Sequence, residues 1–130
     1  MKYLLDTHVL IWALEDSPRL PQKIKDIICD DGNQIYISTV SLWEIGLKHK
    51  ISPETMVYSS SQIRDYSCRA GYIFLSLGVD SVCQNETLDF NGHKDPFDQM
   101  LISQSVANQM RLITHDDKIK KLNIGFIEYF

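Results

Sequence analysis

Short apolar runs alternate with amphipathic segments along the whole chain. Four runs have the length and bulky apolar character of buried strands, at residues 3–5, 35–38, 72–75 and 112–114, and residues 124–127 can add an edge strand. Between them, apolar residues that return every three or four positions predict helices over 9–15, 22–29, 39–48, 59–70, 79–88 and 96–108. This alternation predicts an α/β fold, a three-layer α/β/α sandwich around a mostly parallel central sheet of four to five strands.

Local signals define several helix ends. Pro21 and Pro96 suit first helical positions, where the missing N–H costs nothing, and Gly71 closes the helix that precedes it. Before Pro96, Asp95 is placed to cap the helix, and Asp98 falls on the third helical residue. Both acids then meet free amide donors and the positive end of the helix dipole, which keeps them ionised. Asp-Pro-x-Asp is also an ordinary helix cap, so simple capping stays open here.

Composition indicates an ordinary globular protein. The 130 residues are 44% apolar and 23% charged, which fits one domain over residues 1–130 with a substantial core. Asp6 interrupts the apolar N-terminal run where a signal peptide would continue, and no later run approaches membrane-spanning length, so we expect a cytoplasmic protein. Cys29, Cys68 and Cys83 form no Cys-x-x-Cys pair, which argues against disulfides and zinc knuckles; we expect buried or idle thiols.

Net charge does not decide the partner. A formal charge of −4 and a pI near 5.4 are not typical of a nucleic-acid binder. If four acids share one metal site, however, setting them aside brings the formal charge to zero, and the remaining surface need not repel phosphate.

Four acids fall where the predicted topology brings them together. Asp6 and Asp116 follow strands, while Glu44 and Asp98 lie in the opening turns of helices that face the same sheet edge. Four carboxylates within a few ångströms repel one another unless a cation shares the site, and oxygen ligands favour Mg²⁺ or Mn²⁺. A water activated by such a cation points to phosphodiester hydrolysis. Taken singly, Asp6 can be a helix cap, and Glu44 can pair with Lys48 one turn on.

Other polar and aromatic residues carry weaker signals. The histidines match no zinc spacing, and we expect loop or helix-surface roles for His8, His49, His93 and His115. Three lysines either steer phosphates or are simply solvated: Lys48, Lys50 and Lys94. Trp12 and Trp43 fall on apolar helix faces, so we expect core or dimer-face packing rather than base stacking.

Four segments of the chain resemble the signature segments of PIN-domain ribonucleases, and most of all the VapC-type toxins of bacterial toxin–antitoxin pairs. The resemblance spans nearly the whole chain and rests on residues 4–8, 41–45, 93–98 and 112–116, which read LLDTH, SLWEI, HKDPFD and LITHD. It implies an acidic quartet that binds Mg²⁺ or Mn²⁺: Asp6, Glu44, Asp98 and Asp116. Around this quartet, Thr7 and Thr114 help orient carboxylates or waters, and Asp95 serves as a capping or supporting group.

The resemblance also implies function and partners. A PIN-domain toxin of this type is a metal-dependent endoribonuclease, inhibited by an antitoxin on a separate chain, and forms a homodimer. The family commonly has arginine after the third acid, where this chain has Gln99, so the resemblance does not extend to that basic contact. RNA rather than DNA as substrate follows from the resemblance alone, because no residue here reads a 2′-hydroxyl.

Two other functions fit part of the pattern. A PIN-like module that binds metal and RNA without cutting would have the same fold, but the intact acids argue against it. A phosphate-receiver domain also gathers acids at strand ends, but it needs an acceptor Asp after the third strand and a Lys after the fifth, and neither is present.

Overall fold

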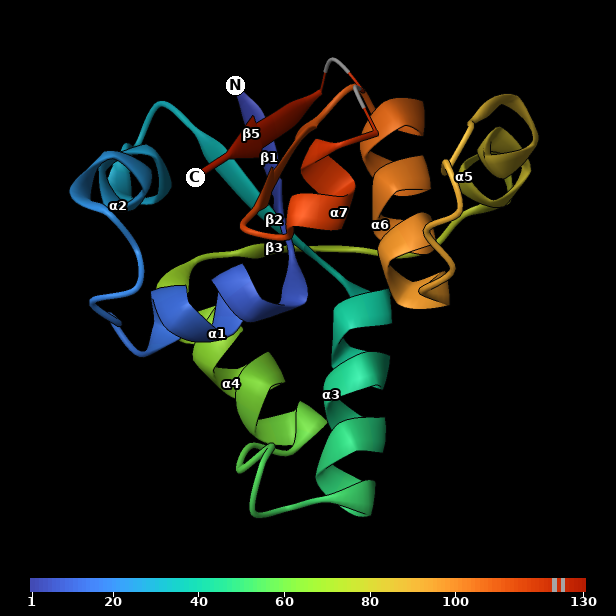
Figure 1. Ribbon diagram of the computed structural model, residues 1–130. Coiled ribbons are helices and arrows are strands. Elements are labelled where there is room, and N and C mark those ends of the chain that lie inside the picture. Colours follow the sequence, from blue (N-terminus) through green and yellow to red (C-terminus); the bar gives the residue numbers. More distant parts are fainter. Residues whose placement is uncertain (123, 125) are drawn as a thin grey trace.

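Five parallel strands form the central sheet of the computed structural model, which describes residues 1–122, 124 and 126–130 (Figure 1). In chain order they are β1 (Lys2–Leu5), β2 (Gln34–Ser38), β3 (Ile73–Leu75), β4 (Arg111–Thr114) and β5 (Ile127–Tyr129). In space their order is β3-β2-β1-β4-β5, and each neighbouring pair is parallel. The first strand therefore lies in the middle, and the carboxyl ends of all the strands meet at one edge. The predicted α/β fold with a parallel sheet is confirmed.

Helices connect the strands. They are α1 (Thr7–Leu14), α2 (Gln22–Cys29), α3 (Thr39–Ile51), α4 (Ser60–Ala70), α5 (Val79–Gln84), α6 (Pro96–Ala107) and α7 (Asp117–Lys120), with a 3₁₀ turn over Asn85–Thr87. The sequence pattern placed every one of these α-helices except α7. That helix has four residues, of which only Ile119 is buried, so it leaves no periodic pattern to detect. None of the helices in the described part of the chain has both the length and the apolar character needed to span a bilayer.

Alternate side chains of each strand enter different halves of the core. Tyr3 and Leu5 of β1 pack with α1, α2 and α4, whereas Leu4 between them packs with α6 and α7. Leu4 and Leu5 are completely buried, and each such side chain contributes about 1.5–3 kcal/mol to folding. Figure 1 shows α2 on one side of the strands and α5 and α6 on the other. The predicted three layers are confirmed, with apolar side chains filling both interfaces.

The inward surface of α6 differs from the prediction. The apolar pattern placed Met100, Val106 and Ala107 inside with Leu101, but only Leu101 of these is fully buried. The helix instead buries Leu101, Ile102 and the polar run 103–105. This helix packs against α3, α5 and β4 at once, so more than one of its faces is enclosed and polar side chains are buried with the apolar ones.

Several side chains expected inside lie at the surface. Trp43 on α3 is 72% exposed, so it is not a core residue, and its place in a dimer face stays a prediction. The three cysteines, expected to be buried or idle, are all exposed. Periodicity placed Trp43 on an apolar face without showing whether another element covers that face.

The last strand begins later than predicted. The edge strand expected over 124–127 includes Gly125, which lies outside the described residues. The observed strand, β5, covers Ile127–Tyr129 and pairs in parallel with β4 at the edge of the sheet.

Candidate metal centre

Two of the predicted acids follow neighbouring strands, β1 and β4. Asp6 comes directly after β1 in the N-cap position of α1, but its side chain does not cap the helix. It accepts instead a hydrogen bond of 2.6 Å at Oδ2 from the Thr114 hydroxyl, and the residue is only 5% exposed. Asp116 follows β4 and caps α7, accepting from the Lys118 amide at 2.8 Å. The parallel register of β1 and β4 therefore brings acids from opposite ends of the chain to the same edge.

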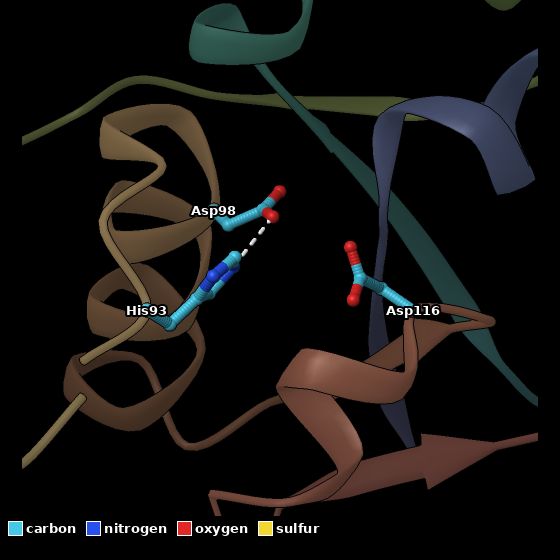
Figure 2. Close-up of side chains that lie close together, drawn as sticks. All are labelled: His93, Asp98 and Asp116. Carbon is cyan, nitrogen blue, oxygen red and sulfur yellow. Dashed lines mark hydrogen bonds and ion pairs between the residues drawn. The ribbon is translucent and has the colours of Figure 1, made fainter. Parts of the chain in front are cut away.

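Asp98 reaches this edge from the first turn of α6. Its helix begins as predicted, with Asp95 at the N-cap accepting from the Phe97 amide at 2.9 Å and the Asp98 amide at 3.2 Å. Asp98 is the third helical residue, and its carboxylate faces Asp116 across the site (Figure 2). One ligand atom each from Asp98, Asp116 and His93 lie within 4.8 Å of one another.

Glu44 lies one turn deeper in its helix than expected. Because α3 begins at Thr39, Glu44 is its sixth residue, in the second turn, and the residue is only 4% exposed. Its Oε1 accepts from the Thr7 hydroxyl at 2.8 Å, and its Oε2 lies 2.5 Å from the Lys48 ammonium. The pair with Lys48 that the spacing allowed is thus present. Glu44 is nevertheless near enough to Asp6 for its charge to raise the pKa of Asp6.

Two threonines hold the acids in place. Thr7, which also lies 3.0 Å from the Ser41 hydroxyl, fixes one oxygen of Glu44. Thr114 donates to Asp6 and accepts from the Asp116 backbone amide at 3.1 Å. A single buried hydroxyl therefore links the two strand-end acids.

The proton affinities of two carboxyls reflect their crowding. Burial, followed by the charge of Asp6, raises the pKa of Asp98 to about 7, while the hydrogen bond with His93 acts in the opposite direction. Burial also raises the pKa of Asp6, and its bond from Thr114 partly offsets that rise. A divalent cation shared by the carboxylates would relieve their repulsion. The oxygen donors of the cluster match Mg²⁺ or Mn²⁺, so the side chains fit the cation that the resemblance implies.

The structure places His93 beside the acids, whereas the sequence predicted only a loop or helix-surface role for it. His93 lies in the turn before α6, with its side chain only 7% exposed and Nε2 2.8 Å from Asp98 Oδ2. Gln99, where the resembling family commonly has arginine, donates to the His93 carbonyl at 2.8 Å. The available signal was position: a histidine five residues before an acid in the first helical turn is close enough to fold back on it.

The remaining histidines make other contacts within the chain, although the charge of His8 is near enough to Asp6 to offset part of the rise in the pKa of Asp6. His49 lies in α3 and bonds through Nδ1 to the Met56 carbonyl at 2.8 Å. His8 and His115 are exposed and contact the half-buried Trp12 ring, at centroid distances of 6.2 and 6.0 Å. Two of the lysines, Lys50 and Lys94, are exposed.

Comparisons with known proteins identify the family. The PIN domain family model matches residues 3–125. The chain is 30% identical over 122 residues to the uncharacterized protein MJ1680 of Methanocaldococcus jannaschii, a match that covers 94% of this chain and 75% of that protein.

Solved structures share the fold at lower sequence identity. VapBC2 from Rickettsia felis, bound to a DNA fragment from its promoter, is 17% identical with a TM-score of 0.70, over 99% of this chain and 98% of that one. DNA-bound VapBC from Salmonella typhimurium is 15% identical with a TM-score of 0.69, over the same shares of the two chains. With the family match over nearly its whole length, the chain belongs to the PIN-domain family.

Proposed function

We propose that this PIN-domain protein is a divalent-metal-dependent endoribonuclease that acts in the cytoplasm as the toxin of a toxin–antitoxin pair. The observation that carries the proposal is the gathering of Asp6, Asp98 and Asp116 at one edge of the sheet, with the pKa of Asp98 raised to about 7. Crowded carboxyls of this kind are costly in a folded protein without a function to retain them.

Each acid has a role in this proposal. Asp6 and Asp98 are the principal ligands of Mg²⁺ or Mn²⁺, and Asp116 is a further ligand, direct or through water. When bound, the cation supplies a water of lowered pKa and neutralises charge on the scissile phosphate. Glu44 is a ligand or a base that orients the attacking water, and the contacts of its two oxygens with Thr7 and Lys48 hold its carboxylate in one orientation.

The similar solved structures and the surface of the protein support two proposed partners, an antitoxin and a second copy of this chain. The similar solved structures include VapBC2 from Rickettsia felis, VapBC from Salmonella typhimurium and a toxin–antitoxin complex from Klebsiella pneumoniae, which favours an antitoxin partner on a separate chain. A groove of about 450 Å³ lies between α1, α3 and the segment after α3, lined by His8, Trp12, Ile51 and Tyr58 among others. An antitoxin tail with apolar side chains would fit it. A homodimer would cover exposed apolar side chains such as Trp43.

RNA cleavage is the direct test. Labelled single-stranded RNA is incubated with the purified protein in MgCl₂ or MnCl₂, with EDTA, and with the Asp98→Asn variant. We expect cleavage that EDTA abolishes and that Asp98→Asn reduces at least about a hundredfold, because the substitution removes a charged ligand. Asp31→Asn, at an exposed loop acid, is the matched control and should cleave normally. Undiminished cleavage both in EDTA and by Asp98→Asn would reject the mechanism.

A further inference from the structure

We propose that His93 is a nitrogen ligand of the bound cation, and that the site therefore prefers Mn²⁺ to Mg²⁺. This rests on the proposed function only in taking the acid cluster to be a cation site. It adds a fifth side chain to the four acids and chooses between the two cations.

The geometry places the ring nitrogen among the acids. His93 Nε2 lies 2.8 Å from Asp98 Oδ2, and one atom of Asp116 completes a trio within 4.8 Å (Figure 2). With the ring proton on Nδ1, Nε2 would have a free lone pair, and a cation held by Nε2 and the two carboxylates would take the place of the hydrogen bond to Asp98.

The backbone holds the ring there. Asn91 and Gly92 have positive φ angles of 48° and 81°, which turn the chain sharply before His93. The His93 amide then donates to the Phe90 carbonyl at 2.8 Å, and Gln99 from α6 donates to the His93 carbonyl. With its side chain 7% exposed, the ring has little freedom to leave the site. The turn and the Gln99 side chain thus present a preorganised donor.

Donor chemistry determines the choice of cation. Mg²⁺ is bound almost wholly by oxygen and loses its waters reluctantly, so an imidazole adds little to its affinity. First-row transition cations accept imidazole readily, and Mn²⁺ is the weakest binder among them, which makes it the conservative one to test. An all-oxygen quartet would discriminate poorly between the two ions, whereas one nitrogen donor favours Mn²⁺.

Calorimetric titration of the metal-free protein with MnCl₂ and with MgCl₂ tests this preference. His93→Gln keeps an amide that can still donate to Asp98 but removes the nitrogen ligand. We expect its Mn²⁺ affinity to fall at least about tenfold while its Mg²⁺ affinity changes less than about threefold. His49→Gln is the matched control, since His49 bonds to a backbone carbonyl away from the acids, and both affinities should stay unchanged. Equal losses for the two cations in His93→Gln, or no loss, would overturn the proposal.

A second measurement needs no variant to fold. Pulsed electron paramagnetic resonance of the Mn²⁺-loaded wild-type protein should show nitrogen-14 modulation from a directly bound imidazole. Absence of that modulation, or failure of Mn²⁺ to bind, refutes the role of His93. Cleavage of RNA with Mn²⁺ but without the modulation leaves the nuclease standing and removes only this inference. Modulation without RNA cleavage would support the role of His93 as a ligand and would count against the nuclease activity.

Discussion

Thr114 shows how much one buried side chain determines at this site. Its hydroxyl donates to Asp6 and accepts from the Asp116 amide, and the residue is completely buried. Asp6 and Asp116 approach from neighbouring strands, so their relative position depends on this shared partner. The Thr114 hydroxyl therefore helps to set the orientation of these two acids relative to each other.

Thr114→Val removes that link without changing the size of the side chain. We expect a loss of about 1–2 kcal/mol in the free energy of unfolding, because a buried carboxyl loses its donor, and a further rise in the pKa of Asp6. Urea denaturation at pH 7 measures the loss. Thr39→Val, at the exposed first position of α3, should change stability by less than about 0.5 kcal/mol. Equal effects of the two substitutions would contradict the role of Thr114.

Asp98 gives the metal-free protein a distinctive dependence on pH. Its pKa is about 7 in the folded state against an ordinary value of 3.8, so the folded state holds a proton that the unfolded chain releases. The free energy of unfolding should therefore fall as pH rises from about 4 to 7, on the order of 2 kcal/mol from this group.

Denaturation in EDTA at a series of pH values measures that slope. Asp98→Asn cannot titrate, so its stability should decline less over the same interval, and the two curves should diverge above pH 5. Parallel curves for the two proteins would show that the carboxyl is not perturbed. Added Mn²⁺ should reduce the fall in the free energy of unfolding with pH in the wild-type protein, because the cation takes the place of the proton on Asp98.

Three acids of the candidate site lie at the starts of helices. Asp6 and Asp116 occupy N-cap positions and Asp98 the third position of α6, so the start of each helix aims a carboxylate at the same edge. The cap of α6 is the clearest case, because Asp95 satisfies two amides there and leaves Asp98 free to face the site.

Asp95→Ala should cost about 1 kcal/mol of stability through loss of this cap. Asp95→Asn should restore most of it, since the amide oxygen can still accept from the Phe97 and Asp98 amides. Thermal denaturation distinguishes the two variants. If both variants lose the same stability, the charge of Asp95 rather than its cap is what matters, and this interpretation of the helix start is wrong.

The sequence predicted the structure correctly where the signal is local. The cap at Asp95, the proline at Pro96 and the strand-end position of Asp6 are each defined by near neighbours, and the parallel topology then followed. It failed where burial depends on distant elements: Trp43 sits on an apolar face that no other element in the described structure covers. The sequence did not predict the approach of His93 to Asp98, because that approach depends on positive φ angles at Asn91 and Gly92, which these residue types permit but do not require.

On the proposed function, cation binding and folding of the whole chain are linked. The acids come from β1, β4 and α6, so the site exists only in the folded chain, and a ligand that binds only there stabilises it. Mn²⁺ at one hundred times its dissociation constant should add about 2.7 kcal/mol to the free energy of unfolding.

Thermal denaturation with and without MnCl₂ checks this linkage. The melting temperature should rise by several degrees, return to its starting value on addition of EDTA, and respond little to Mn²⁺ in Asp98→Asn. A rise of the same size in Asp98→Asn would place the stabilising ion elsewhere on the protein.

The central position of β1 has a consequence for biosynthesis. β1 obtains one of its two partners, β4, only after residues 111–114 have been made, and Asp6 meets Thr114 across 108 positions of chain. A partly translated polypeptide that lacks β4 therefore contains neither the complete sheet nor the cation pocket. On the proposed function, a nascent chain that has not yet reached β4 cannot cut the RNA that encodes it.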